Sequence, residues 1–252
     1  PESDRQHILR FGELGAPSLD IGLSWQQYMQ VHEGLVGFNT WLTGHLERLR
    51  RDPGDDLMSQ LIQASQASDE AARLSERELQ ATAGLVLAAG FETTVNLLGN
   101  GIRMLLDTPG HLEALSARPE LWPTAVEEIV RMASPVTHFR RTVTTDGVRL
   151  GGHEFKVGEK VVLWYNSANR DEAVFDDPDR FDVRRDPNPH VGFGGPGPHF
   201  CLGAHLARRE VGVMFRHLLT RLPDIRSTAE PDLLRTNFVN GIKHLPCAWT
   251  PA

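Results

Sequence analysis

Cysteine is scarce in this sequence, long hydrophobic runs are missing, and positive charge is not in excess. The two cysteines, Cys201 and Cys247, are too few for a disulfide framework, so a reducing, cytoplasmic location is expected. The longest apolar run, residues 83–91, includes two glycines and is too short to span a bilayer. Because 26 lysines and arginines face 33 acidic residues, the net charge of −7 argues against nucleic acid as a partner.

The beginning of the chain carries no basic stretch followed by an apolar one, the pattern of a secretory signal. It starts at Pro1 instead of Met, as expected for a piece of a longer protein. Since no internal repeat or low-complexity tract divides the sequence, we expect one globular domain over residues 1–252.

Much of the chain is predicted to be helical. Apolar spacing and end signals predict helices over residues 24–51, 55–66, 76–106, 123–132 and 202–222. Ser75 and Glu78 have the spacing of a capping box at the start of the third helix. Because residues 79–106 are apolar on nearly every side, we expect this helix in the middle of the domain.

Strands are predicted only in short segments. Residues 141–144 and 160–164 have strand composition, and residues 236–239 and 242–245 flank Asn240-Gly241 as a predicted hairpin. Residues 176–203 have little periodicity, and so long an irregular stretch is usually functional. The order of elements predicts a mainly α fold with small β-sheets rather than a regular βαβ alternation.

The irregular stretch ends in a glycine-rich loop, residues 191–203, with the sequence VGFGGPGPHFCLG. Glycines let the backbone approach a bulky, flat ligand closely. Cys201 directly precedes a predicted helix, whose positive end favours the thiolate form, and Gly203 leaves room beside the sulfur. A soft thiolate suits iron, and a thiolate bound to haem iron favours cleavage of the O–O bond. The loop therefore predicts a haem ligand.

Other interpretations of the loop are weaker. A lone cysteine is usually a small buried residue, but the glycines, His199 and the following helix argue together against that. His199, Cys201 and His205 could bind zinc, but a fourth ligand and a common zinc spacing are lacking. A phosphate-binding loop would need a lysine that is missing.

The long predicted helix carries the motif AGFETT at residues 89–94. Gly90 removes a side chain where a ligand could lie against the helix. Glu92 and Thr93 place an acid beside a hydroxyl, a pair that can relay protons when buried. By itself the motif fits equally a solvent-facing glutamate beside helix-tolerated threonines.

Two further positions predict a structural cluster. Glu128 and Arg131 are three residues apart on one helix and can form an ion pair. Arg180, in the irregular segment, is predicted to complete a buried triad with them.

These motifs, in this order along the whole chain, resemble the cytochrome P-450 family of haem-thiolate monooxygenases. The resemblance implies the cytochrome P-450 fold, with only its C-terminal part present, because family chains begin well upstream of residues 1–5. It also implies a haem (iron protoporphyrin) ligated by Cys201, and an enzyme that uses dioxygen to hydroxylate a hydrophobic substrate.

The same resemblance assigns roles to residues. Glu92 and Thr93 would be the acid–alcohol pair that delivers protons to dioxygen. The haem propionates would meet His199 and Arg141, with Arg140 as a rival for the second role. The remaining assignments are Phe193, Gly203, Ala89 and Gly90 beside the cofactor, Glu128, Arg131 and Arg180 as structural braces, and Val136, Phe238 and Val239 as lining of the substrate cavity.

The sequence of the loop is similar to that of a soluble actinobacterial subgroup of the family. In both, the phenylalanine (here Phe193) lies eight residues before the cysteine, instead of the seven of the commonest family motif. Residues 167–171 and 241–246 are similar to it too. Members hydroxylate methyl-branched lipids and sterol side chains, with electrons from ferredoxin and ferredoxin reductase. Arg208 and Arg209, expected to be exposed, could help such an acidic partner dock, although a solvated helix face is the simpler interpretation.

Two alternatives stay open. Without the upstream part, the chain could be a non-catalytic remnant that binds haem weakly or not at all. A haem protein could also perform isomerase or peroxygenase chemistry, but that chemistry needs no proton relay such as Glu92 and Thr93.

Overall fold

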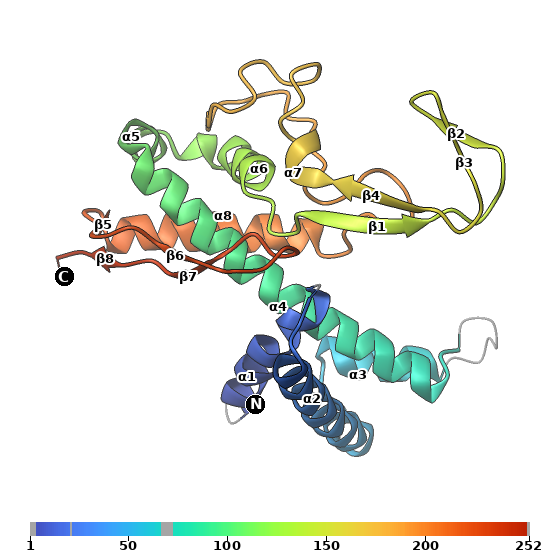
Figure 1. Cartoon of the computed structure of the whole chain (residues 1–252). Coiled ribbons are helices and arrows are strands. Elements are labelled where there is room, and N and C mark those ends of the chain that lie inside the picture. The colour runs from blue at the N-terminus through green and yellow to red at the C-terminus, as the bar shows by residue number, and fades with distance from the viewer. Residues whose placement is uncertain (1–3, 21, 67–72, 251–252) are drawn as a thin grey trace. The chain divides into compact units, whose positions relative to one another are not determined.

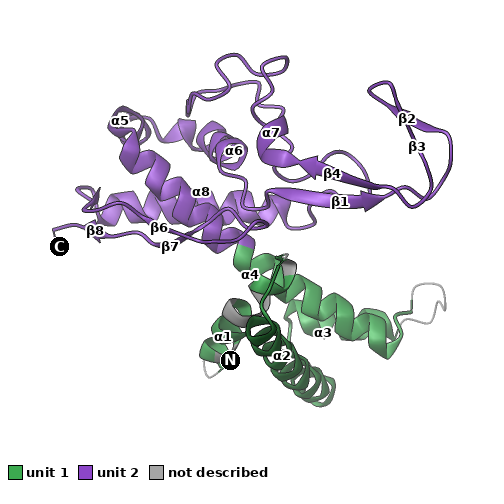
Figure 2. Ribbon diagram, in the orientation of Figure 1, with its two compact units in different colours: residues 1–92 green, residues 93–252 purple. Residues whose placement is uncertain are grey.

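The computed structural model describes residues 4–20, 22–66 and 73–250. The chain divides into two compact units, residues 1–92 and residues 93–252, which are coloured separately in Figure 2. The long helix α4, Glu76–Asp107, begins in the first unit and ends in the second. The prediction of one domain over the whole chain stays a prediction.

The first unit is helical. It contains α1 (Arg5–Gly15), the 3-10 turn η2 (Ala16–Leu19), α2 (Trp25–Arg51), α3 (Leu57–Ser65) and the first part of α4. The predicted capping box is present, because the Glu78 amide donates to Ser75 Oγ (3.3 Å) and the Ser75 amide donates to the Glu78 carboxylate (2.9 Å). The core of this unit consists of Leu42, Leu46, Met58, Ile62, Leu79 and Ala83.

Helix α4 is less buried than its apolar sequence predicts. By length and composition alone it could cross a membrane, a test that the core helix of a soluble protein also passes. Leu97 and Leu105 are buried in the second unit, but Leu85 is 68% and Val95 51% exposed. The expectation of burial on every side is therefore wrong, since each core takes up only one face of the helix.

The second unit packs helices α4, α6 and α8 around one core. Helix α6 (Trp122–Met132) lies against α8 (Ala204–Arg221) (Figure 1). Between them the Trp122 ring stacks on Phe215 with centroids 6.0 Å apart. The remaining helical pieces are α5 (Pro109–Ala117), the 3-10 turn η4 (Pro119–Leu121) and α7 (Tyr165–Ala168). Leu97, Ile102, Leu105, Leu115, Val126, Ile129, Val183 and Val211 belong to this core.

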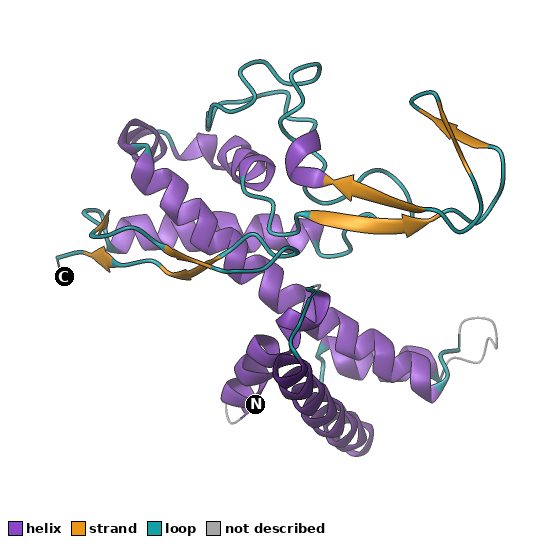
Figure 3. Ribbon diagram, viewed as in Figure 1, coloured by secondary structure: helices purple, strands orange, loops and turns teal. Residues whose placement is uncertain are grey.

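Small antiparallel sheets complete the described part of the second unit (Figure 3). The pairs are β1 (His138–Thr142) with β4 (Lys160–Trp164), β2 (Val148–Leu150) with β3 (His153–Phe155), β5 (Arg226–Ser227) with β8 (Cys247–Ala248), and β6 (Asp232–Leu233) with β7 (Ile242–His244). The predicted fold class, mainly α with small sheets, is confirmed.

The predicted hairpin around Asn240-Gly241 is wrong. Strand β7 pairs with β6, and residues 236–239 turn instead toward the segment that follows α6. There the Thr137 amide donates to the Phe238 carbonyl (3.0 Å), and the Asn240 amide donates to the Pro135 carbonyl (2.7 Å). These backbone groups find partners far away in sequence, which a local hairpin pattern cannot indicate.

Gly101 on α4 is a test of how tightly the second core is packed. A Cβ there would lie 2.7 Å from the Phe215 ring and 3.0 Å from Ile129. We expect Gly101→Ala to lower the free energy of unfolding by about 1–3 kcal/mol, despite the better helix propensity of alanine. Chemical denaturation measures this, with Gly110→Ala as the control, because a Cβ at Gly110 meets nothing within 4 Å. Equal stability of the two variants would contradict the packing.

Candidate functional site

Cys201 stands at the junction between the glycine-rich loop and helix α8, with an exposed thiol. Its amide donates to the carbonyl of Phe193 (2.9 Å), so the two ends of the loop are joined. Gly194 and Gly197 have φ of 88° and 136°, values that favour glycine and let the chain turn back. The loop therefore presents a sulfur atom on a closed backbone frame.

The surroundings of this sulfur fit a large, flat, apolar cofactor bound through a soft ligand. Phe200 and Leu202, its neighbours in sequence, are exposed, Leu202 to 92%, and Leu206 of α8 is 61% exposed. Cβ atoms at Gly195 and Gly197 would meet nothing within 4 Å, which leaves the loop surface open. Among the described residues no three His, Cys, Asp or Glu side chains gather as a metal site, so His199 and His205 do not form a zinc cluster with Cys201.

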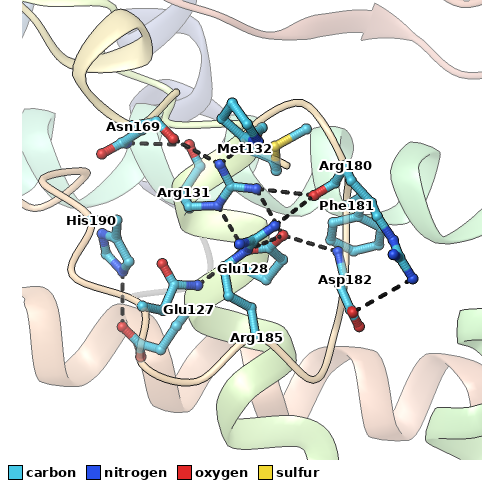
Figure 4. Close-up of polar contacts among 12 residues, drawn as sticks. Glu127, Glu128, Arg131, Met132, Asn169, Arg180, Phe181, Asp182, Arg185 and His190 are labelled. Carbon is cyan, nitrogen blue, oxygen red and sulfur yellow. Dashed lines mark hydrogen bonds and ion pairs between the residues drawn. The ribbon is translucent and has the colours of Figure 1, made fainter. Parts of the chain in front are cut away.

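Behind the loop lies a buried ion pair on α6 (Figure 4). Glu128 and Arg131 are both 0% exposed, and the guanidinium meets the carboxylate through two hydrogen bonds of 2.8 and 2.9 Å. Arg131 also donates to the carbonyls of Asn169, Pro178 (each 2.7 Å) and Arg180 (3.1 Å). The predicted pair is present, and its donors hold the irregular segment in place.

The predicted third member of the triad is corrected by the structure. Arg180 contributes its backbone carbonyl, while its side chain is 65% exposed and lies 3.9 Å from Asp182. The guanidinium that reaches Glu128 belongs to Arg185, at 3.2 Å and 12% exposure. The segment turns between the two arginines and carries the side chain of Arg180 outward, as Figure 4 shows.

In the described part of the chain, Glu128 also accepts from the Asp182 amide (2.9 Å) and from Asn188 Nδ2 (3.0 Å). Burial raises the pKa of Glu128, but the hydrogen bonds from Arg131, the Asp182 amide and Arg185 outweigh burial, so the pKa lies below its ordinary value. The carboxylate is therefore charged at neutral pH.

Asn169, which is fully buried, connects this network to the cysteine loop. Its side-chain Nδ2 donates to the Arg131 carbonyl (3.2 Å), and its Oδ1 accepts from the Val191 amide (2.8 Å). Gly192 follows at once, and a Cβ there would clash with Val130 at 2.6 Å and Ser134 at 2.7 Å. The loop thus rests directly on α6.

A second charged cluster lies beside the first. Glu127 accepts from Arg208 of α8 (2.6 and 2.9 Å) and from His190 (2.9 Å). Burial raises the pKa of Glu127, but these partners lower it to about 2 in total. Arg208 is therefore engaged in an ion pair rather than displayed for a redox partner, while Arg209 is exposed.

The predicted substrate-lining residues Val136, Phe238 and Val239 come together. Val136 and Val239 form a β-bridge, and the Phe238 ring contacts Phe139 of β1 with centroids 5.5 Å apart. The predicted propionate ligand Arg141 lies over the Phe139 ring (5.7 Å), whereas Arg140 is exposed. The structure therefore places these apolar residues in one cluster, next to the arginine.

The motif on α4 lies where the two units divide. Ala89 and Gly90 are exposed, and a Cβ at Gly90 would meet nothing within 4 Å. Glu92 and Thr93 are half-buried, the last residue of the first unit and the first of the second. Their roles as a proton relay stay predictions.

A cavity of about 260 Å³ is lined by Thr137, Asn166, Arg170 and Val239 among others, but by no residue of the loop 191–203. It is therefore distinct from the surface around the Cys201 thiol.

The sequence did not indicate Glu127, Asn169, Arg185, His190 or Arg208 as members of these networks. Glu127 directly precedes Glu128 and has no informative spacing of its own. The signals that exist are weak: a run of two arginines at 184–185 and a histidine just before the glycine-rich loop.

Comparisons with known proteins agree on one family. The family model described as Cytochrome P-450 matches residues 119–242. Cytochrome P-450 140 of Mycobacterium tuberculosis is 54% identical over 254 residues, with 100% of this chain and 57% of that protein covered. The methyl-branched lipid omega-hydroxylase of the same species is 44% identical over 253 residues, covering 99% and 58%. The chain thus spans somewhat over half the length of these relatives.

The solved structures that superpose on this chain include bacterial cytochromes P-450. The P-450 named BioI, in complex with an acyl carrier protein bearing hexadec-9Z-enoic acid, superposes with a TM-score of 0.92 at 32% identity, covering 99% of this chain and 63% of that one. A Mycobacterium marinum cytochrome P-450 in complex with pseudoionone has a TM-score of 0.88 at 38% identity, covering 99% and 60%.

Arg180 and Arg185 form a matched pair for testing the corrected triad. We expect Arg185→Gln to lower the free energy of unfolding by about 1–3 kcal/mol, because a charged, nearly buried donor of Glu128 is lost. Arg180→Gln should change it by less than about 0.5 kcal/mol, because only its backbone takes part. Urea denaturation decides; a larger effect at Arg180 would restore the original assignment.

The lowered pKa of Glu127 predicts a pH effect. Its ion pair stabilises the fold above the ordinary pKa of 4.5, and this contribution is lost as the pH falls toward about 2. Glu127→Gln should therefore be less stable than the parent at pH 7, and the difference should shrink in acid. Denaturation curves at pH 7 and in acid measure this difference, with the exposed Glu113→Gln as control. A constant difference would show that the charge is not the cause.

Proposed function

The chain belongs to the cytochrome P-450 family, and we propose that it is the haem-holding part of a haem-thiolate monooxygenase. The observation that carries the proposal is the exposed Cys201 on a loop whose two ends are hydrogen-bonded and which rests on α6 and on Asn169. When bound there, haem supplies the activation of dioxygen for insertion of one oxygen atom into a C–H bond.

The residues of this chain would hold the cofactor from its sulfur-bearing side. Cys201 would donate its thiolate to the iron, and Phe193 and Gly203 would lie close to it. His199 and Arg141 would bind the carboxylates of the haem edge, with Arg140 as the rival of Arg141. Both candidate arginines are on β1, and Arg141 is the less exposed of the two.

Proton delivery is assigned to the motif on α4. The Glu92 carboxyl would donate its proton to the Thr93 oxygen as the Thr93 hydroxyl gives up its own proton, and the Glu92 carboxylate would then be reprotonated. Ala89 and Gly90 lie one turn earlier, where the open space at Gly90 leaves room for a ligand against the helix.

The substrate is proposed to be a hydrophobic molecule of the lipid class, a methyl-branched lipid or a sterol side chain. The cluster of Val136, Phe238 and Val239 offers apolar contacts and no charge of its own. The support from relatives is the name of the methyl-branched lipid omega-hydroxylase and a Bacillus megaterium P-450 structure in complex with testosterone, at 35% identity and a TM-score of 0.85.

Electrons are proposed to come from ferredoxin and ferredoxin reductase in the cytoplasm. These partners are inferred from the soluble bacterial relatives. Of the two arginines considered for docking, Arg209 is the more exposed, and Arg208 is paired with Glu127.

An absorption spectrum tests the proposed cofactor. We expect the haem-supplemented chain, reduced under carbon monoxide, to show the red-shifted Soret band of thiolate ligation, and Cys201→Ala to lose it. Cys247→Ala should keep the band, because Cys247 lies on strand β8 and not in the cysteine loop 191–203. A thiolate band that survives in Cys201→Ala would refute the ligand. A folded chain that takes up no haem would favour the non-catalytic remnant.

A further inference from the structure

Three separate parts of the second unit meet at the Glu127 carboxylate. Arg208 of α8 donates to it from Nε (2.6 Å) and Nη2 (2.9 Å), and Nε2 of His190 lies 2.9 Å from the same group. Glu127 is on α6, and His190 immediately precedes the cysteine loop. The carboxylate therefore ties both helices to the loop.

The protonation states follow from the contacts. The Gly192 amide donates to Nδ1 of His190 (3.1 Å), so Nε2 carries the hydrogen and donates to Glu127. The hydrogen bond from Arg208 and its positive charge contribute to a Glu127 pKa of about 2. The same pair raises the pKa of Arg208, so both groups are charged at neutral pH.

Arg208 also contacts the loop at Phe193, over whose ring its guanidinium lies. Its central carbon lies 4.4 Å from the centroid of the Phe193 ring, and the His190 ring approaches Phe193 at 5.8 Å. The Phe193 carbonyl is the acceptor for the Cys201 amide (2.9 Å). A continuous path of contacts thus runs from Glu127 through Arg208 and Phe193 to Cys201.

We propose that Arg208 is a positioning residue, which holds Phe193 against α8 and thereby fixes the backbone that carries the Cys201 sulfur. Glu127, His190, Phe193 and Arg208 together are called the Phe193 clamp. The proposal deepens the proposed function. It rests on that function only for the assignment of haem iron as the partner of the Cys201 sulfur.

An ordinary surface ion pair would not meet these conditions. His190 is 2% exposed and Arg208 31%, and the guanidinium donates two hydrogen bonds to Glu127 while its central carbon lies over the Phe193 ring. Helix α8 begins at Ala204, so Arg208 lies about one turn from the end of the helix that adjoins the loop. Lysine could keep the charge but not the planar contact.

Hydrogen exchange of the Cys201 amide in the whole chain reports directly on the bond to Phe193. We expect roughly tenfold faster exchange in Arg208→Gln, and an intermediate rate in Arg208→Lys. The neighbouring Arg209→Gln is the matched control and should exchange as the parent does. Amides of α4 around the buried Leu97 and Leu105 should change much less than the Cys201 amide in every variant, because a general loss of stability would speed their exchange too.

Equal Cys201 exchange in Arg208→Gln and Arg209→Gln would overturn the proposal, as would faster exchange spread evenly over the second unit. If Arg208→Gln does not fold, Phe193→Leu keeps the ion pair, removes the aromatic face, and should again loosen the Cys201 amide selectively.

The carbon monoxide spectrum provides the second measurement. In chain loaded with haem, Arg208→Gln should convert part of the thiolate band into the form without thiolate, and Arg209→Gln should not. A parent chain that takes up no haem would count against the proposed function alone, because the exchange experiment uses haem-free chain and still decides the role of Arg208.

Discussion

The buried ion pair of Glu128 and Arg131 is the constraint on which the rest of the second unit depends. Two charges removed from water are tolerated only when further hydrogen bonds satisfy them. The carboxylate therefore draws in Arg185, Asn188 and the Asp182 amide, while the guanidinium takes three backbone carbonyls. An irregular segment without helix or sheet is held in one conformation because its polar groups are the partners that this pair requires.

Helix α6 passes that order on in two directions. The helix fixes the loop that carries Cys201 in two ways. Asn169, which bonds to α6, accepts from the Val191 amide, and Glu127 of α6 bonds to His190. At its C-terminal end the chain continues into residues 135–137, whose backbone bonds to the segment of Phe238 and Asn240. The cysteine and the apolar cluster proposed for substrate are thus positioned by the same helix, one from its side and the other from its end.

The two faces of the proposed site differ in the way they are built. The loop that bears the sulfur is supported from behind by charged, buried and multiply hydrogen-bonded groups, as suits a ligand that must keep its geometry. The residues proposed to meet substrate are apolar or, on α4, partly exposed.

Local patterns in the sequence determined helices α2, α3, α4, α6 and α8, the capping box of α4, strand β4 and the end of β1, the pair Glu128–Arg131 and the prominence of Cys201. Each depends on residues a few positions apart, where spacing and backbone preference decide. Only the tertiary structure decided that Arg185 replaces Arg180, that β7 pairs with β6, and that Arg208 turns to Glu127 and Phe193. These choices depend on which distant group a polar atom meets when it leaves water, and nothing in the neighbouring residues encodes that.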